Sequence, residues 1–215
     1  MRPIILIAPP QAGKGTIAKF LVDDYKLPHI STGDIFKEEV AKGSELGKEL
    51  KIKMDQGILI EDELTIGLVM DRIKQDDCKD GYILDGFPRN LNQAKVYKDE
   101  MDKAGLDLGL VIELTIPFEV ALDRVITRVI CSNCGSSWST NPESIVYVSD
   151  NKCKRCDSEL TTRSDDNEET LRKRIDVYNE STKPILDYYE DYGTVYHFDN
   201  VDSLKTYELI KELLK

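Results

Sequence analysis

Three short apolar runs stand out along this chain, at residues 4–7, 81–85 and 109–114. Two further short segments, residues 29–31 and 194–198, are interpreted as strands. Short apolar runs that are bounded by turn residues are typical of buried strands. The segments between them carry apolar residues every three or four positions, as one face of a helix does.

This spacing predicts helices over most of the remaining chain. The ranges are 16–25, 32–42, 46–57, 62–73, 90–104, 117–129, a long helix capped by residues 164–166, and 203–214. Pro184 is expected to bend or end the long helix. Strands that alternate with helices favour right-handed crossovers and a parallel sheet covered on both faces. We therefore expect a three-layer α/β fold around a five-stranded parallel sheet.

Composition limits the classes of protein that fit. The chain has 215 residues, of which 40% are hydrophobic and 32% charged, and its formal net charge is −11. It contains no apolar run near the roughly 18 residues that a membrane helix needs. The acidic balance argues against nucleic-acid or membrane-surface binding, because both rest on positive charge. With no recognisable export signal, we expect a cytoplasmic protein.

The stretch from residue 4 to residue 16 runs from an apolar strand through a short loop into a helix. In that geometry, backbone N–H groups and a helix N-terminus converge on phosphate. Gly13 allows the backbone to come close to the phosphates, Lys14 brings a positive charge, and the Thr16 hydroxyl can reach an oxygen of the ligand. The general pattern G-x-x-x-x-G-K-[ST] is not fully met, because Ala8 replaces the first glycine and Gly15 delays the hydroxyl. The alternative is an ordinary strand–helix turn with a surface lysine.

A second polar group follows the strand at residues 81–85. A carboxylate at a strand end, here Asp85, can orient the waters around Mg²⁺, and the planar guanidinium of Arg89 can bind phosphate through two N–H groups. Gly86 allows a ligand to come close. Because ligands of open parallel sheets bind beyond the carboxyl ends of the strands, Asp85 and Lys14 are expected at one site. A charged turn stiffened by Pro88 is the alternative.

Arginines flank an insert in which the pattern changes, from residue 130 to about residue 162. Arg124 and Arg128 are predicted on one helix face, Arg163 leaves the insert, and Arg174 lies in the following helix. We interpret these four as phosphate ligands. For Arg172 and Lys173 we prefer a solvated helix face paired with Glu168 and Glu169.

The insert carries four cysteines in two C-x₂-C pairs. They are Cys131, Cys134, Cys153 and Cys156, with eighteen residues between the pairs. This spacing predicts a tetrahedral Zn²⁺ site with four thiolates, which leaves no open coordination position, so the zinc would be structural. A nucleic-acid-binding zinc ribbon is the competing interpretation, and the acidic charge argues against it.

Together, these motifs resemble the long-lid adenylate kinases with a zinc-binding lid. The resemblance covers essentially the whole chain and rests on residues 12–16, 31–34, 84–89 with Gln93, 160–170 and 172–174, and the four cysteines. It implies a P-loop NTPase-like core, a helical NMP-binding domain and a small zinc-containing β lid. The implied boundaries are 1–30, 61–126 and 165–215 for the core, 31–60 for the NMP-binding domain and 127–164 for the lid.

The resemblance also implies an activity, Mg-dependent transfer of a phosphoryl group from ATP to AMP to give two ADP, and roles for particular residues. The catalytic residues would be Lys14, Arg89, Arg124, Arg128, Arg163 and Arg174. ATP would be bound by Gln11, Ala12, Gly13, Lys14, Gly15, Thr16, Arg124, Arg128, Ser137, Trp138 and His197. AMP would be bound by Thr32, Gly33, Lys37, Leu59, Ile60, Gly86, Arg89, Gln93, Arg163 and Arg174. Asp34 and Asp85 would hold Mg²⁺ through water.

Three positions depart from the family pattern. Ala8 and Gln11 replace glycines, and Lys37 replaces an arginine that grips the AMP phosphate. A Gln11 at positive φ would carry strain of about 1–2 kcal/mol. A nucleoside monophosphate kinase with a broad donor range and a regulator with weakened catalysis therefore stay open as alternatives. We expect a monomer, with a small homo-oligomer as the other option.

Overall fold

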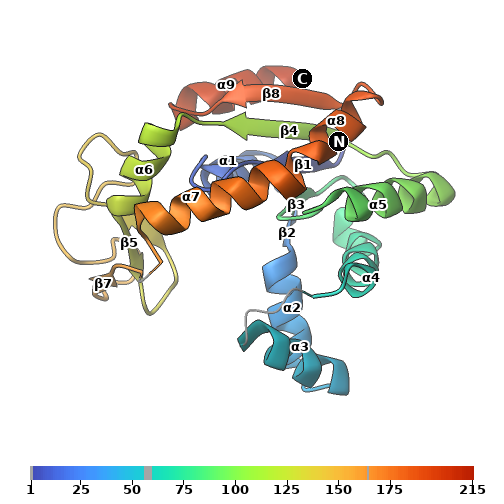
Figure 1. The fold of residues 1–215 in the computed structure, drawn as a ribbon, viewed down its shortest axis with the longest axis horizontal. Helices are drawn as coiled ribbons and strands as arrows, with labels where there is room; N and C mark the ends of the chain where they lie inside the picture. The colour runs from blue at the N-terminus through green and yellow to red at the C-terminus, as the bar shows by residue number, and fades with distance from the viewer. Residues whose placement is uncertain (1, 56–59, 164) are drawn as a thin grey trace.

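A computed structural model describes residues 2–55, 60–163 and 165–215. Its centre is a five-stranded parallel sheet, which confirms the predicted core (Figure 1). The strand order is β2-β3-β1-β4-β8. The strands are β1 (Ile4–Ile7), β2 (His29–Ser31), β3 (Ile83–Asp85), β4 (Leu110–Thr115) and β8 (Val195–Asp199).

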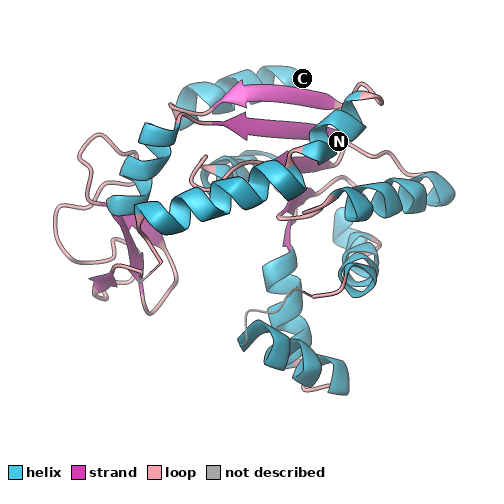
Figure 2. Ribbon diagram, viewed as in Figure 1, coloured by secondary structure: helices cyan, strands magenta, loops and turns pink. Residues whose placement is uncertain are grey.

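Helices cover both faces of this sheet, so the three-layer expectation is also confirmed (Figure 2). Along β1, Ile4 and Leu6 join one apolar cluster and Ile5 and Ile7 join the other, as side-chain alternation requires. Helices α1 (Lys14–Tyr25) and α9 (Ser203–Leu213) supply the first cluster. The second is supplied mainly by α4 (Asp62–Ile73), α5 (Leu91–Ala104) and α8 (Pro184–Glu190).

Two smaller units project from the core. Helices α2 (Thr32–Ala41) and α3 (Glu45–Asp55) form a helical arm below the sheet in Figure 1. The insert forms a three-stranded antiparallel sheet of order β6-β5-β7, made of β5 (Arg128–Cys131), β6 (Ser137–Ser139) and β7 (Leu160–Thr161). A helical arm and a small β lid are what the resemblance implied.

The predicted helix over residues 117–129 is wrong at its end. Helix α6 (Phe118–Ile126) stops before Thr127, and Arg128 begins β5. The β-branched residues Val129 and Ile130 pair with β6 instead of continuing the helix. Arg124 and Arg128 therefore lie on different elements and not on one helix face.

The helix after the insert also begins later than expected. Asn167 caps α7 (Glu168–Val177) by accepting a hydrogen bond from the Thr170 backbone N–H (2.8 Å). The cap was predicted at residues 164–166, of which Ser164 lies outside the described residues. A π-helical turn, Tyr178–Thr182, follows α7, and Pro184 opens α8 as a first-turn proline. The expected effect of Pro184 is thus confirmed.

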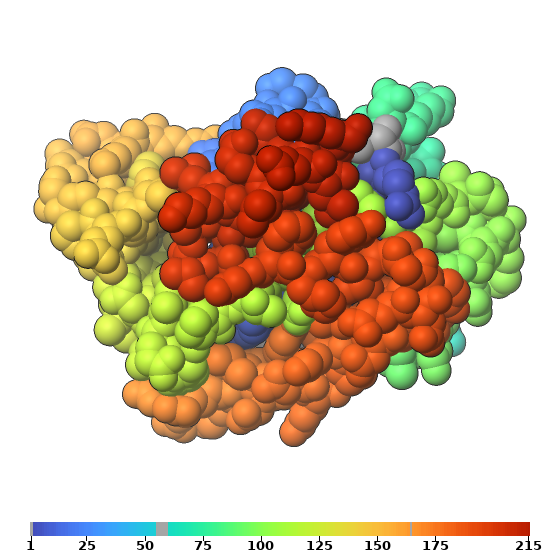
Figure 3. All heavy atoms as spheres, turned by 90° about the horizontal axis from the view of Figure 1, so that it is seen from above, coloured from blue at the N-terminus to red at the C-terminus, as the bar shows by residue number. Residues whose placement is uncertain are grey.

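The C-terminal part of the chain covers much of the face seen in Figure 3, where it is coloured orange to red. The lid, in yellow, lies at one edge of that face. Among the helices of the described residues, none has the length and apolar character that crossing a membrane would take.

Candidate functional site

The loop between β1 and α1 holds its shape through two residues at positive φ. Gly13 has φ 79° and precedes α1, and Gln11 has φ 65°. A Cβ on Gly13 would lie 2.5 Å from Nδ2 of Asn200, so this position needs glycine for space as well as for conformation. The expectation that Gln11 occupies the left-handed region is confirmed. Lys14 then begins α1, where the helix N-terminus favours an anion.

The side chains of Arg124 and Asn200 stabilise this loop by hydrogen bonds to its backbone carbonyls. Arg124 donates to the carbonyl of Gln11 (3.0 Å) and to the carbonyls of Asn200 (2.9 Å) and Val201 (2.8 Å). The fully buried Asn200 donates to the carbonyl of Ala12 (2.5 Å). Burial lowers the pKa of Arg124. Arg124, predicted to bind ATP, is engaged with backbone carbonyls of the loop and of the segment that follows β8.

Lys14 lies between the loop and the end of β3. Its Nζ is 2.9 Å from Oδ1 of Asp85, and Nε2 of His29 is 3.0 Å from Oδ2 of the same carboxylate. Burial raises the pKa of Asp85, but the His29 ring and the Lys14 ammonium outweigh it and lower the pKa to about 2. The carboxylate is thus ionised throughout the neutral range. The predicted meeting of Lys14 and Asp85 is confirmed.

A cleft of about 1890 Å³ opens over the loop. It is lined by the loop, the turn after β3, the lid and α7. Nine of its described lining residues are cationic: Lys14, Lys19, Arg89, Arg128, Lys154, Arg155, Arg163, Lys173 and Arg174. No aspartate or glutamate is among the described lining residues, although the chain as a whole has a net charge of −11. The cleft is therefore a local concentration of positive charge suited to a polyanion.

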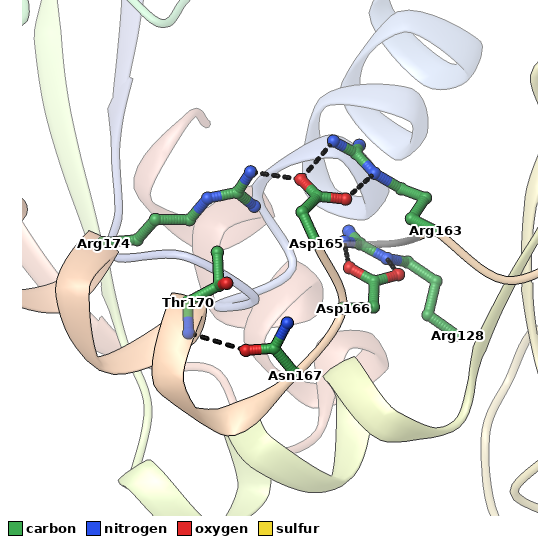
Figure 4. A network of polar contacts seen from close by, with 7 residues as sticks. All are labelled: Arg128, Arg163, Asp165, Asp166, Asn167, Thr170 and Arg174. Carbon is green, nitrogen blue, oxygen red and sulfur yellow. Dashed lines mark hydrogen bonds and ion pairs between the residues drawn. The ribbon is translucent and has the colours of Figure 1, made fainter.

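Two aspartates hold the arginines at the lid end of the cleft (Figure 4). Asp165 accepts from Arg163 (2.7 Å) and from Arg174 (2.5 Å). Arg128 makes a two-pronged contact with Asp166, whose side chain is only 4% exposed. Arg163, followed by Arg174, lowers the pKa of Asp165 to about 2. The structure thus brings together three of the four arginines predicted from the sequence, all except Arg124.

On the other side of the cleft, Arg89 lies against the turn after β3. It donates to the carbonyl of Gly86 (2.8 Å) and to the hydroxyl of Thr32 (3.3 Å). Gln93 is buried, with its amide oxygen on the Arg89 backbone N–H (2.8 Å) and its amide nitrogen on Asp62 (2.7 Å). Thr32, Gly86, Arg89 and Gln93, predicted to bind AMP, therefore lie together.

Other residues predicted for AMP and magnesium are more exposed. Lys37 forms an ion pair with Asp34 (2.8 Å) one turn earlier in α2, and both side chains are largely exposed. Gly33 lies in the first turn of the same helix. Ile60 lies in the segment before α4, and Leu59 is outside the described residues.

His197, predicted near the donor purine, is engaged elsewhere. Its Nδ1 lies 2.6 Å from the buried Glu113 and its Nε2 3.2 Å from Glu190. Glu113 also accepts from the hydroxyl of Tyr178 (3.0 Å). The contact with Glu113 raises the pKa of His197. His197 is absent from the described residues that line the cleft, whereas Ser137 and Trp138 of the lid line it as expected.

The four cysteines of the insert converge. Their sulfurs all lie within 4.8 Å of one another. The Sγ atoms of Cys131 and Cys156 are 3.4 Å apart, and those of Cys134 and Cys153 are 3.6 Å apart. A tetrahedral site with Zn–S bonds of about 2.3 Å has sulfur–sulfur edges of about 3.8 Å. The spacing of the sulfurs therefore fits a four-thiolate metal site.

Groups around two of the four cysteines favour thiolates. At Cys131, in contrast, backbone N–H donors lower the pKa of the thiol, but burial and the neighbouring thiols of Cys156 and Cys134 outweigh them and raise it to about 11. The Ser158 hydroxyl and backbone N–H, with Cys131, lower the pKa of Cys156 to about 6. Burial raises the pKa of Cys153, but the backbone N–H groups of Arg155 and Cys156 and the Trp138 side chain lower it overall. Thiolates are the ligands that Zn²⁺ takes in such sites, so the donor set suits this metal.

Sequence reasoning missed several residues of the site. Asn200 and His29 reach it only through the strand order of the sheet, which no local pattern reveals. Lys154 and Arg155 could have been found, because a cationic pair between two cysteine ligands must lie on the tip of a metal knuckle.

The parallel sheet, the phosphate-type loop and the cationic cleft define a nucleotide-binding α/β protein of the P-loop class. The family model described as adenylate kinase matches residues 6–194. An adenylate kinase of Clostridioides difficile is 47% identical over 89% of this chain and 88% of its own length. One from Archaeoglobus fulgidus is 42% identical over 99% of both chains. The chain belongs to the adenylate kinase family.

Proposed function

We propose that this protein catalyses ATP + AMP ⇌ 2 ADP with Mg²⁺. The observation that carries the proposal is the cleft with nine cationic and no acidic described lining residues, placed over a phosphate-type loop in a member of the adenylate kinase family. Two polyanions that repel each other need such an environment to come close. Relatives named adenylate kinase match over nearly the whole chain, which supports this activity over the alternatives.

The chemistry needs no protein base. An AMP phosphate oxygen is already ionised near neutral pH, so it can attack without losing a proton. The protein instead aligns the two nucleotides and neutralises charge in the transition state. We assign Lys14 to the transferred group and Arg128, Arg163 and Arg174 to the surrounding phosphate oxygens.

For these arginines to reach phosphate, their contacts with Asp165 and Asp166 must loosen or be shared. Each carboxylate holds a guanidinium at the cleft before a ligand arrives, so less side-chain entropy remains to be lost on binding. We propose that residues 127–164 move as a lid and residues 31–60 as an AMP-binding arm. Closure would exclude water, which competes as phosphoryl acceptor.

Within these units, the remaining predicted residues are assigned as follows. Residues 11–16, with Ser137 and Trp138 of the lid, would surround the ATP phosphates and nucleoside. Thr32, Gly86, Arg89 and Gln93 would hold AMP, and Gln93 would have to exchange one of its present partners to read the adenine edge. Arg124 supports the phosphate loop in this proposal, and Lys37 is a candidate for the AMP phosphate once it leaves Asp34.

The proposed function involves two metal ions, Mg²⁺ bound together with ATP and a structural Zn²⁺. Asp85 is an ionised carboxylate beside the phosphate loop, which suits the water shell of Mg²⁺ that arrives with ATP. The more exposed Asp34 is the second candidate. Cys131, Cys134, Cys153 and Cys156 would hold a structural Zn²⁺, which would replace the apolar core that so small a lid lacks. A cytoplasmic location and a monomeric state stay predictions.

A coupled assay for ADP tests the activity. ATP, GTP, CTP and UTP as donors, crossed with AMP, CMP, UMP and GMP as acceptors, should show turnover chiefly with ATP and AMP. Lys14→Ala should lower kcat by about 10²-fold or more. Lys79→Ala is the matched control, because Lys79 is an exposed lysine paired with Asp76 and is not among the described residues of the cleft. Equal rates with all donors would favour the broad-range kinase, and background rates with every pair would favour the regulator.

A further inference from the structure

Arg155 is the arginine of this chain whose side chain has no partner among the described residues. The other eight arginines each donate to a carboxylate or to a backbone carbonyl. Arg155 is exposed and lines the cleft, whose described lining residues include no aspartate or glutamate. In a chain with a net charge of −11, this guanidinium is thus left available to an anion from outside the protein.

The backbone of Arg155 is held by the second cysteine pair of the lid. Arg155 lies between Cys153 and Cys156, and its backbone N–H donates to Sγ of Cys153 (3.4 Å). The ammonium of the preceding Lys154 donates to the carbonyl of Tyr147 (2.6 Å), so this side chain is engaged within the lid. The turn between the two cysteines therefore presents the Arg155 guanidinium to the cleft from a backbone that is fixed in place.

The position of this turn in the lid places Arg155 on the donor side of the cleft. The Sγ atoms of Cys153 and Cys134 are 3.6 Å apart, so the two cysteine pairs adjoin. Ser137 and Trp138, which follow Cys134 in the chain and are assigned above to ATP, line the same cleft. Trp138 also packs against the apolar cluster that contains Cys153. The residues assigned to AMP lie instead around the turn after β3, on the other side of the cleft.

We infer that Arg155 binds a phosphate oxygen of the donor nucleotide, in addition to the arginines assigned above. The inference rests on the proposed function. A guanidinium suits phosphate because its N–H groups and its charge meet the oxygens together. Arg128, Arg163 and Arg174 must loosen their contacts with aspartates before they reach phosphate, whereas Arg155 gives up only water. The turn between Cys153 and Cys156 thereby serves donor binding as well as the structure of the lid.

Calorimetric titration of the full chain with ATP, and separately with AMP, tests this contact. Arg155→Gln should raise the Kd for ATP about five- to tenfold and leave the Kd for AMP within about twofold of the unmodified protein. Arg155→Lys keeps the charge and should bind ATP more tightly than Arg155→Gln does. The matched control is Lys152→Gln, because Lys152 is an exposed lysine of the same lid, lies 3.6 Å from Asp157 and is not among the described residues of the cleft. This control should leave both Kd values within about twofold.

Two further measurements separate a charge contact from a structural role. Thermal unfolding without nucleotide should give Arg155→Gln and Lys152→Gln the same Tm, because both side chains are exposed. Raising the salt concentration should shrink the difference in ATP affinity between the unmodified protein and Arg155→Gln, because the contact is electrostatic.

The outcomes distinguish this inference from the proposed function. Equal Kd values for ATP in Arg155→Gln and Lys152→Gln, an equal rise for AMP, or no gain from Arg155→Lys over Arg155→Gln would overturn the inference, while turnover of ATP and AMP by the unmodified protein would still support the proposed function. An unmodified protein that neither binds ATP nor turns it over with AMP would overturn both.

Discussion

Gly13 and Gly15 lie two residues apart in the phosphate loop, and the structure predicts opposite outcomes when each is replaced by alanine. Gly13 has φ 79°, where an L-residue costs about 1–2 kcal/mol. Its added Cβ would also lie 2.5 Å from Nδ2 of Asn200. Asn200 is fully buried and donates to Ala12, so moving it breaks that bond and leaves a buried amide without a partner, at about 1–3 kcal/mol.

The sum for Gly13→Ala is a loss of about 2–5 kcal/mol in the free energy of unfolding. In a chain of this length this loss corresponds to a fall in Tm of roughly 4–20 °C. Gly15 has ordinary helical backbone and open space around its Cβ position, so Gly15→Ala should leave stability unchanged or raise it by up to about 1 kcal/mol. Urea and thermal unfolding without nucleotide measure both variants.

Adding Asn200→Ala to Gly13→Ala separates the two contributions. Because the small side chain removes the clash, the double variant should lose less than the sum of the two single variants. Equal stability of Gly13→Ala and Gly15→Ala, or strict additivity with Asn200→Ala, would refute the account of the loop.

Three further predictions concern single features of the structure. Gln11→Gly should raise the free energy of unfolding by about 0.5–1 kcal/mol, because the relief of backbone strain at φ 65° exceeds the effect of the added freedom of the unfolded chain. Urea unfolding measures this free energy, and a decrease would contradict the strain at Gln11. The folded-state pKa of Asp85 is lowered to about 2, so its ion pairs stabilise the protein above the unfolded pKa of 3.8, and about 2 kcal/mol of that stability is lost as the pH falls through about 2. The difference in stability between the unmodified protein and Asp85→Asn should therefore shrink between pH 4 and pH 2, and a constant difference would exclude this linkage. Arg128→Ala should lower the free energy of unfolding by about 3–5 kcal/mol, because it leaves the buried Asp166 unpaired. Arg128→Leu combined with Asp166→Leu should recover most of this loss in thermal unfolding, and no recovery would contradict the pairing.

The core was predictable because its signals are local. The three central strands of the parallel sheet, β3, β1 and β4, are short apolar runs; Gly13-Lys14 lies just beyond β1, and Asp85 ends β3. The open-sheet rule then places both at one edge, where the structure has them 2.9 Å apart. The four cysteines were equally readable, because their spacing alone specifies convergence.

The errors came where long-range pairing overrode a local pattern. Residues 128 and 129 were included in the preceding helix because the β-branched pair Val129 and Ile130 is only a weak local signal, and pairing with β6 and β7 is what makes residues 128–131 a strand. Arg124 was predicted to bind phosphate, and no local pattern revealed that it also donates to backbone carbonyls more than 70 residues away in sequence. Asp165 and Asp166 were expected to cap a helix, but Arg128, Arg163 and Arg174 are stronger partners than the helix N-terminus.

Calorimetric titration with a bisubstrate mimic, two adenosines joined through five phosphates, tests most directly whether the cationic cleft accommodates both nucleotides at once. We predict one mimic bound per chain, with an affinity that weakens as salt rises and is strongly reduced in Lys14→Ala but not in Lys79→Ala. Absence of binding heat from the unmodified protein across a range of temperatures, or an equal affinity in both variants, would contradict the central claim.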